Sequence, residues 1–192
     1  MSSRILILEL PVVLLLFSAC TSKADDNGMT RAGDRVEALV LTATFDKAVV
    51  HQGEKLVATL VLRNVSKSTL WVNKRLLFND EASPPALREL WVRVRRSDGT
   101  PVQGDCVGRS LPPLDSDYGV LQAGESITTR ENLSCLGLAP GRYELVARYA
   151  DGNDRPPPPP TGSMQWRKVI QSPPVTFEVV PAPATSGGAP TR

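Results

Sequence analysis

The clearest hydrophobic pattern along the chain is an alternation of period two, which predicts β-strands. In residues 55–63 the leucines and the alanine at even positions fall on one face, and the intervening residues fall on the other. Residues 89–95 and 175–179 alternate in the same way. Successive side chains of a strand point to opposite faces of a sheet, so each of these segments predicts a strand with one buried face.

Further strand candidates are bounded by turn residues. They lie at residues 36–45, 70–73, 118–121, 126–133 and 143–149. The last of these follows the turn residues Pro140-Gly141, and Gln122-Ala-Gly-Glu125 predicts that 118–121 and 126–133 pair as a hairpin. No convincing helical pattern follows the first twenty residues, so the sequence predicts an all-β fold.

Tyr143 carries a resemblance to a known fold. A tyrosine at the start of a strand, directly after Pro-Gly, resembles the tyrosine corner of immunoglobulin-like domains, in which the phenol bonds back to the backbone. The resemblance implies an immunoglobulin-like, two-sheet antiparallel Greek-key sandwich of about 7–9 strands, with strand F starting at Tyr143. It also implies strands B and C at 55–63 and 70–73, with Trp71 as a core tryptophan. The positions comparable to the antibody disulfide, around Leu60 and Leu145, are apolar, so the similarity is to fibronectin-type or bacterial sandwich modules.

The 192 residues divide into four parts by composition. We expect a signal peptide at 1–19, a flexible tether at 20–35, the sandwich at 36–180 and a disordered tail at 181–192. The central part is long enough for one domain with a core of its own.

The leader ends in a lipidation motif. Arg4 precedes a mostly apolar stretch, and Leu16-Phe-Ser-Ala-Cys20 resembles the lipobox of bacterial lipoproteins. The resemblance implies that Cys20 is diacylated and anchors the protein in the cell envelope. Thr21 points to the outer membrane, with the domain facing the periplasm or the surface. An ordinary signal peptide and an uncleaved anchor are the alternatives.

The chain has three cysteines, and lipidation of Cys20 would leave a pair. Cys106 and Cys135 lie in the loops before and after the predicted hairpin. A hairpin brings its two ends together, so a disulfide between these two cysteines, at one end of the sandwich, is feasible.

The sequence contains few residues that could form a metal site or a catalytic site. His51 is the one histidine, and there is no Cys-x-x-Cys or Gly-x-Ser-x-Gly motif. We therefore expect no cofactor, no metal and no enzyme activity, although a carboxylate-based hydrolase stays open because Asp and Glu are plentiful. The net charge of +2 gives no reason to expect a nucleic-acid partner.

Residues 151–170, between strands F and G, are the predicted partner-binding segment, at the end of the sandwich opposite the disulfide. Pro156 to Pro160 form a stiff proline run, and Met164 and Trp166 are candidate anchors. Residues Pro156, Pro158 and Pro160 complete the predicted contact set. In the alternative, the segment is a spacer whose Trp166 packs onto the sheet.

A second candidate surface is a basic strand face. Arg93 and Arg95 share a strand face with Trp91. This face is either a cationic patch for an anionic envelope partner or simply a solvated strand face.

The patterns together predict a lipid-anchored cell-envelope binding module without catalysis. Its partners would be the membrane, through the lipid, and an envelope protein or glycan; the sequence leaves the oligomeric state undefined. One alternative is a proteinase inhibitor with an immunoglobulin-like fold, because Gln52-Gly-Glu54 leading into an alternating strand and Asn64 resembles such inhibitors. The other is the carboxylate-based hydrolase.

Overall fold

The computed structural model describes residues 38–79, 88–102, 104, 111–151, 153 and 155–183. The predicted signal peptide, the tether with Cys20, and residues 184–192 of the tail lie outside the described residues. No helix within the described part of the chain is both long and apolar enough to cross a membrane. The strands are β1 (Leu39–Phe45), β2 (Val49–His51), β3 (Val57–Asn64), β4 (Leu70–Asn73), β5 (Leu90–Arg96), β6 (Tyr118–Leu121), β7 (Ser126–Asn132), β8 (Gly141–Tyr149), β9 (Met164–Gln165), β10 (Ile170–Gln171) and β11 (Val175–Val180), with short 3₁₀ turns η2 (Asp115–Asp117) and η3 (Ser134–Leu136).

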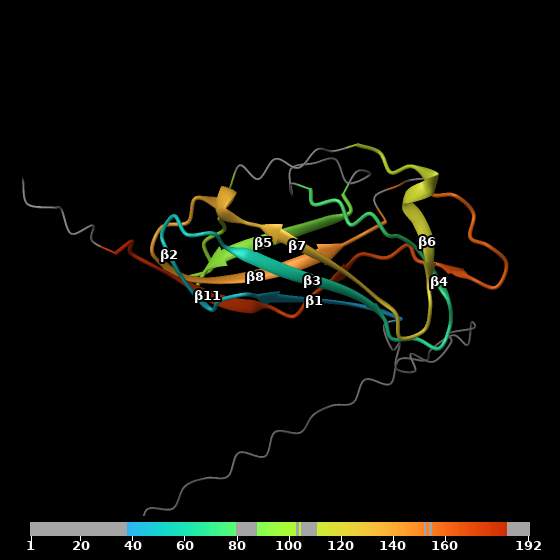
Figure 1. Ribbon diagram of the computed structural model, residues 1–192, viewed down its shortest axis with the longest axis horizontal. Coiled ribbons are helices and arrows are strands. Elements are labelled where there is room, and N and C mark those ends of the chain that lie inside the picture. The colour runs from blue at the N-terminus through green and yellow to red at the C-terminus, as the bar shows by residue number, and fades with distance from the viewer. Residues whose placement is uncertain are drawn as a thin grey trace, which may run out of the picture. The chain divides into compact units, whose positions relative to one another are not determined.

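Two sheets pack face to face (Figure 1). One has the order β1-β3-β7, and all its pairings are antiparallel. In the other, β8 pairs with β5 on one side and with β10 and β11 on the other, and β2 runs parallel to β11 at the edge. The chain crosses between the sheets from β3 to β5, back to β7, and again to β8. This order confirms the predicted immunoglobulin-like two-sheet sandwich.

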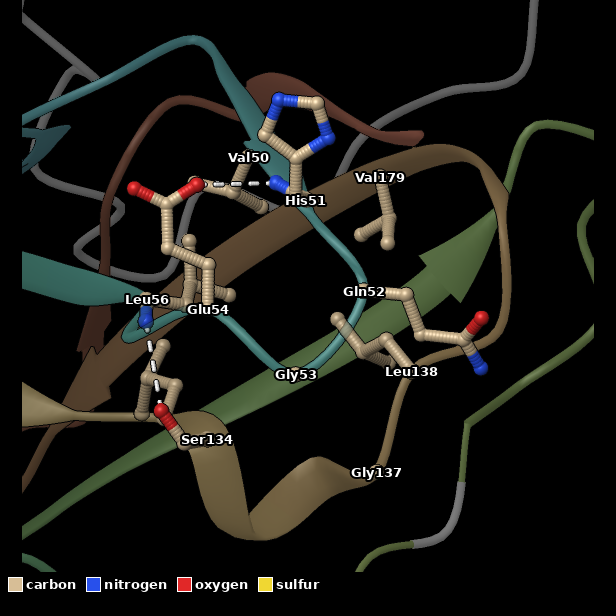
Figure 2. A pocket seen from close by; sticks show the side chains of 11 residues that line it. Val50, His51, Gln52, Gly53, Glu54, Leu56, Ser134, Gly137, Leu138 and Val179 are labelled. Atoms are coloured by element: carbon tan, nitrogen blue, oxygen red, sulfur yellow. Dashed lines mark hydrogen bonds between the residues drawn. The ribbon is translucent and has the colours of Figure 1, made fainter. Parts of the chain in front are cut away.

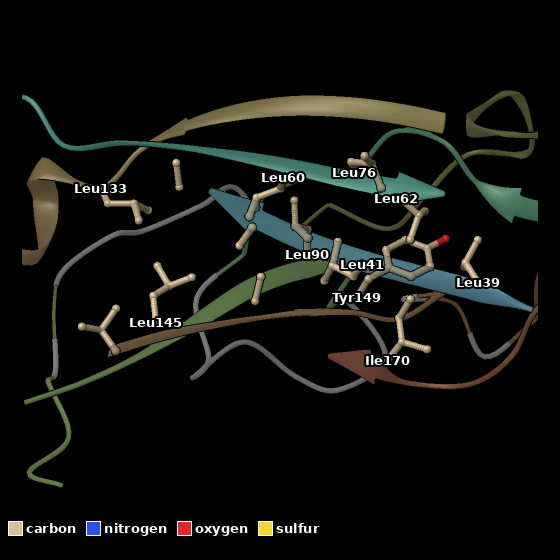
Figure 3. Close-up of a cluster of buried hydrophobic side chains, with 14 of the residues drawn as sticks. Leu39, Leu41, Leu60, Leu62, Leu76, Leu90, Leu133, Leu145, Tyr149 and Ile170 are labelled. Atoms are coloured by element: carbon tan, nitrogen blue, oxygen red, sulfur yellow. The ribbon is translucent and has the colours of Figure 1, made fainter. Parts of the chain in front are cut away.

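The core lies between the two sheets and follows the predicted alternation (Figure 3). The face predicted to be buried in residues 55–63 is buried, with exposed fractions of 4% at Leu56 and 0% at Leu60 and Leu62. Leu145 and Tyr149 of β8 face them from the second sheet and are both 0% exposed. Each such leucine contributes about 1.5–3 kcal/mol through burial, so this face accounts for much of the stability of the fold.

Tyr143 makes the bond that a tyrosine corner requires. Its phenol oxygen donates a hydrogen bond to the carbonyl oxygen of Ala139 at 2.6 Å. The ring is 2% exposed and stacks on Phe177 of β11, with 5.4 Å between ring centroids. The bond therefore fixes the turn before β8 while the ring packs between strands β8 and β11.

The predicted hairpin of 118–121 and 126–133 is wrong in its pairing. β6 pairs with β4, β7 pairs with β3, and β9 pairs parallel with β4 to complete a small third sheet. The reason is a bend: residues 65–69 and 122–125 interrupt both strands of one long antiparallel ribbon at the same place.

Asn64 holds this bend. Its side chain is 0% exposed, and its amide nitrogen donates to the carbonyl oxygens of Ser68 at 2.8 Å and Leu121 at 2.9 Å. The amide oxygen accepts from the backbone nitrogen of Ser66 at 3.0 Å. One buried side chain thus satisfies backbone groups from both halves of the ribbon.

The assignment of strand C is also corrected. β5, not β4, lies beside β8, with Leu90 opposite Tyr149 and Arg96 opposite Tyr143. Trp71 belongs to the small sheet and is half-buried, so it is not the core tryptophan that the resemblance implied.

Candidate functional site

The segment that connects β8 to β11 (residues 150–174) passes the end of the sandwich where the small sheet lies, opposite η3 (Figure 1). Its position agrees with the prediction. The first described residue of the predicted partner-binding segment is Asp151, which is 9% exposed. How this segment is held determines what surface it can present.

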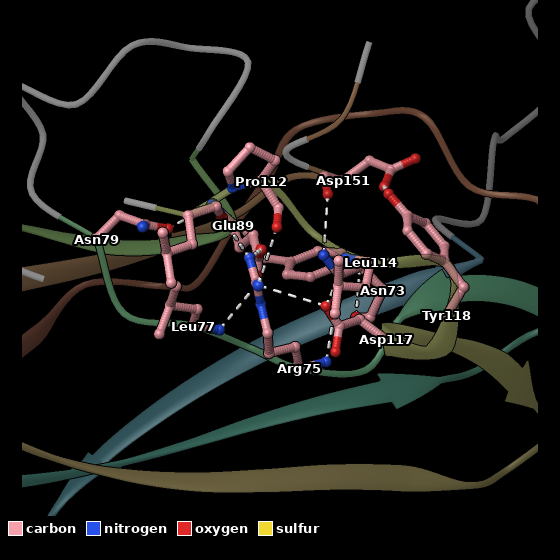
Figure 4. A network of polar contacts seen from close by, with 12 residues as sticks. Asn73, Arg75, Leu77, Asn79, Glu89, Pro112, Leu114, Asp117, Tyr118 and Asp151 are labelled. Atoms are coloured by element: carbon pink, nitrogen blue, oxygen red, sulfur yellow. Dashed lines mark hydrogen bonds and ion pairs between the residues drawn. The ribbon is translucent and has the colours of Figure 1, made fainter. Parts of the chain in front are cut away.

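Asp151 attaches the segment to the small sheet (Figure 4). The hydroxyl of Tyr118 donates a hydrogen bond to Asp151 Oδ1, and Asn73 Nδ2 donates to the Asp151 carbonyl oxygen at 3.2 Å. The hydroxyl of Tyr149 donates to the carbonyl oxygen of Asn73 at 3.0 Å. Side chains of β4, β6 and β8 therefore converge on the start of the segment.

Burial sets the proton affinities of this group. It raises the pKa of the Asp151 carboxyl, while the hydrogen bond from Tyr118 and the positive charge of Arg167 act in the opposite direction. Burial also raises the pKa of Tyr118, and the hydrogen bond to Asp151 raises it further. The phenol consequently stays protonated and acts as a permanent donor.

A second buried carboxylate, Glu89, lies in the same region (Figure 4). Its side chain is 0% exposed and pairs with the Arg75 guanidinium, and its Oε2 accepts from the backbone nitrogen of Leu77 at 3.0 Å. Arg75 also donates to the carbonyl oxygen of Leu111 at 2.8 Å and lies 3.3 Å from Asp117. Glu89 is thus fully buried against protein groups, and Asp151 nearly so, which is unlike a carboxylate pair open to a substrate.

The proline run rests on the small sheet. Trp71 Nε1 donates to the carbonyl oxygen of Pro157 at 3.2 Å, and the indole stacks on Tyr118 with 6.3 Å between ring centroids. Pro156 and Pro157 are half-buried, whereas Pro158 and Pro160 are exposed. One side of the run is therefore bound to the domain and the other faces outward.

Backbone pairing fixes the second half of the segment. A turn closes with a hydrogen bond from Ser163 N to Pro160 O at 3.0 Å, and Gly162 takes the positive φ of 85° that this turn requires. Met164 N then donates to Thr69 O at 2.9 Å, and Trp166 N donates to Trp71 O at 3.1 Å. The segment is held as an additional strand of the small sheet.

The two predicted anchors behave differently. Trp166 is 8% exposed, belongs to the core cluster, and donates from Nε1 to the Lys168 carbonyl oxygen at 2.8 Å. The indole therefore packs onto the sheet, as in the alternative interpretation of this segment. The prediction that Trp166 contacts a partner is wrong, and the residue instead supports the segment from inside. Met164 is 54% exposed, and Val169, which sequence reasoning missed, is 62% exposed.

At the opposite end of the sandwich there is a hollow of about 270 Å³ (Figure 2). Sequence reasoning missed it, because three segments that are distant in the sequence build it. The turn at His51 and Glu54, which carried the resemblance to inhibitors, forms part of its rim, and its floor is apolar. The lining residues are Val50, His51, Gln52, Gly53, Glu54, Leu56, Leu133, Ser134, Gly137, Leu138 and Val179.

The rim of this hollow is occupied by internal bonds. His51 Nδ1 lies 3.0 Å from the carbonyl oxygen of Pro181, and His51 N donates to Glu54 Oε2 at 2.9 Å. The hydrogen bond from Lys47 lowers the pKa of Glu54, and the His51 backbone bond lowers it further. Nowhere in the described ranges do three His, Cys, Asp or Glu side chains group as metal ligands would.

Of the predicted disulfide pair, Cys106 lies outside the described residues. Cys135 lies in η3 at the end of the sandwich where β8 begins. Gly104 lies beside it: a Cβ added to Gly104 would come within 2.9 Å of Leu136 Cα. The chain two residues before Cys106 therefore approaches the residue after Cys135, and the bridge stays a prediction.

Comparisons with known proteins give similarities of fold. No protein-family model and no curated protein matches the chain. The solution structure of a CARDB domain from Pyrococcus furiosus is 12% identical and matches 74% of this chain and 94% of that chain, with a TM-score of 0.36. The crystal structure of the same domain, in complex with di-metal ions, is 13% identical over 75% and 94% of the two chains, with a TM-score of 0.37.

A β-glucosidase from Listeria innocua is also similar to this chain. It is 14% identical, with 75% of this chain matching 16% of the enzyme and a TM-score of 0.33. Similarities of this size carry nothing about function, and the fold described above rests on the strand order of the chain itself.

Proposed function

We propose that the protein is a non-catalytic binding module of a bacterial cell envelope, anchored to the membrane by lipid on Cys20. Its partner surface is the outward side of the segment between β8 and β11. The partner is an envelope protein or glycan, and the apolar character of the surface favours a protein.

One observation carries this proposal: an apolar surface is held outward by a segment that is attached to the domain at several of its described residues. Pro158, Pro160, Met164 and Val169 are exposed, while Asp151, the backbone of Met164 and the buried Trp166 attach the segment to the domain. A surface that is already ordered loses little conformational entropy on binding, and this lowers the cost of association. Apolar side chains that are exposed but rigid are typical of contact residues for another protein.

The experiment is capture of partners from solubilised envelope membranes by the mature protein, followed by affinity measurement with the captured partner. Met164→Thr removes the most exposed apolar side chain of β9. Val49→Thr is the matched control, because Val49 on β2 is 53% exposed, nearly the same as Met164 at 54%. Loss of about 1.4 kcal/mol of contact energy corresponds to tenfold weaker binding, so we expect roughly that change for Met164→Thr and none for Val49→Thr.

Equal binding by Met164→Thr and the unmodified protein would place the partner surface elsewhere. A combined replacement of Pro158 and Pro160 by Ser gives an independent test of the proline run, since neither side chain supports the core. Trp166→Ala serves a different purpose: we expect it to lower stability, because the indole is buried.

The anchor is tested separately. Cys20→Ser should move the protein from the membrane fraction to the soluble fraction and abolish labelling with an alkynyl palmitate. Two acyl chains suffice for stable anchoring, so a residual membrane-bound fraction comparable to that of the unmodified protein would contradict the lipid attachment.

A further inference from the structure

The outer face of the sheet that contains β5 and β8 carries an ordered set of basic side chains. Arg93 lies opposite Val146, and Arg95 lies opposite Glu144, in the antiparallel pairing of β5 with β8. The neighbours Val94 and Leu145 are 3% and 0% exposed, so they point into the core. Because side chains alternate along a strand, the residues at 93, 95, 144 and 146 point outward.

A short side chain makes a hollow in the middle of this face. Val146 stands between longer neighbours, and the space above it is about 150 Å³. This volume is enough for a small oxyanion. The lining residues are Arg93, Arg95, Glu144, Val146, Arg148 and Gln171.

The charge of the lining is positive, with three guanidinium groups and one carboxylate. Arg148 is half-buried, and its Nη2 lies 3.4 Å from Gln171 Oε1. Its Nε is buried and has no hydrogen-bond partner among the residues that the structure describes. A buried donor without an acceptor costs about 1–3 kcal/mol. An anionic oxygen is the acceptor that a guanidinium binds most strongly, and a rotation of the Arg148 side chain toward an anion in the hollow would give this donor an acceptor.

We propose that this hollow is a binding site for a single phosphate group. The guanidinium groups of Arg95 and Arg148 come from different positions on two strands, which suits a tetrahedral phosphate with oxygens in several directions better than a planar carboxylate. The site lies on a sheet face and shares only Gln171 with the segment between β8 and β11, so it adds a second ligand to the molecule. The phosphate is free in solution or belongs to a lipid headgroup, and in both cases the guanidinium groups bind its non-bridging oxygens.

The test is isothermal titration of the domain with inorganic phosphate at constant ionic strength. We expect saturable binding, at least tenfold weaker in Arg148→Gln and in Arg95→Gln. Arg142→Gln is the matched control: Arg142 lies on the same strand β8, its side chain is 78% exposed, and it pairs with Glu178 outside the hollow. Its loss removes the same charge and should change the affinity by less than twofold.

Val146→Phe separates a built site from a general positive field. The variant keeps all three arginines and fills the hollow, so we expect it to abolish phosphate binding. Circular dichroism and the thermal midpoint verify that each variant is folded. Arg95 is exposed, so Arg95→Gln should fold and tests the site even if Arg148→Gln or Val146→Phe does not fold.

The source of the phosphate is distinguished with vesicles. Binding to phosphatidylglycerol vesicles but not to phosphatidylcholine vesicles, with competition by inorganic phosphate, would assign the headgroup. Absence of vesicle binding together with saturable phosphate binding would assign a soluble phosphate. The proposal is overturned by absence of saturable phosphate binding, by equal weakening in Arg142→Gln and Arg95→Gln, or by normal binding in a folded Val146→Phe.

Discussion

The hydroxyl of Tyr118 donates a hydrogen bond to the carboxylate of Asp151, and this contact joins β6 of the small sheet to the start of the segment between β8 and β11. The two residues are far apart in the sequence, and both are buried. The same tyrosine ring stacks on Trp71, which holds the proline run through Pro157. One side chain thus supports the proposed partner surface through both its polar and its aromatic parts.

Tyr118→Phe should loosen this segment without disturbing the rest of the sandwich. The change keeps the ring that stacks on Trp71 and removes the donor, leaving the Asp151 carboxylate buried without that bond. A buried acceptor that loses its partner costs about 1–3 kcal/mol, so urea unfolding should show a loss of this size. Amide hydrogen exchange should accelerate at Met164 and Trp166, whose backbone nitrogens bind the small sheet. Unchanged exchange at both amides would show that the bond does not order the segment.

The raised pKa of Asp151 predicts a pH dependence of stability. The folded protein binds this proton more tightly than the unfolded chain, because burial disfavours the charged carboxylate. The contribution of the group is therefore fully present below the unfolded pKa of about 3.9 and is lost as the pH rises through the higher folded pKa.

Asp151→Asn isolates this effect from those of other carboxylates. The amide oxygen can still accept from Tyr118, and the variant carries no charge at any pH. We expect the variant to gain stability relative to the unmodified protein as the pH rises from about 4 to 7, measured as the difference in urea unfolding free energy. A difference that is constant over this range would mean that the carboxyl titrates alike in both states.

Much of the sandwich could be predicted from the sequence, because burial of one face leaves a period-two pattern. Leu56 to Leu62 and Tyr143 are placed by that pattern and by local turn chemistry. The sequence could not decide whether the strand with Trp71 or the strand with Trp91 lies beside β8. Both strands have similar hydrophobic patterns, and only the long-range pairing distinguishes them. The role of Asn64 could not be predicted either. In the sequence it looks like a turn residue, whereas its side-chain amide donates a hydrogen bond to the carbonyl oxygen of Leu121, far along the chain.

The position of the segment between β8 and β11 was predicted from the sequence, but the contacts that attach it to the domain were not. Proline content and strand order placed the segment between β8 and β11 at the correct end of the sandwich. Its attachment depends on backbone bonds between β9 and β4, which leave no mark on side-chain pattern. This is why Trp166 could be read as an exposed anchor, although it is buried, and why Val169 was missed.

Tyr143→Phe tests the corner before β8. The ring stays packed on Phe177, and the variant loses the 2.6 Å bond to Ala139. A typical hydrogen bond contributes about 0.5–1.5 kcal/mol, so the free energy of unfolding should fall by that amount. Thermal unfolding followed by near-ultraviolet circular dichroism measures it, and Tyr149→Phe, which removes the bond to Asn73 instead, is the comparison variant. A neutral Tyr143→Phe would show that the turn is held by Pro140-Gly141 alone.

The predicted disulfide rests on a different geometry from the one that the sequence suggested. No hairpin brings the two loops together; instead, the chain after β5 turns back, with Val102 N bonded to Val94 O at 2.9 Å, and reaches Leu136 at Gly104. A bridge between Cys106 and Cys135 would close a loop of about thirty residues, worth roughly 3.5 kcal/mol in the chain-entropy model.

We expect the oxidised mature domain to contain no reactive thiol at these positions. Cys106→Ser and Cys135→Ser should lower stability equally, and the double variant should be no less stable than either single one. Mass spectrometry after thiol labelling under denaturing conditions, with and without reductant, measures the bridge directly. Labelling of both cysteines without reductant, or additive effects of the two substitutions, would rule it out.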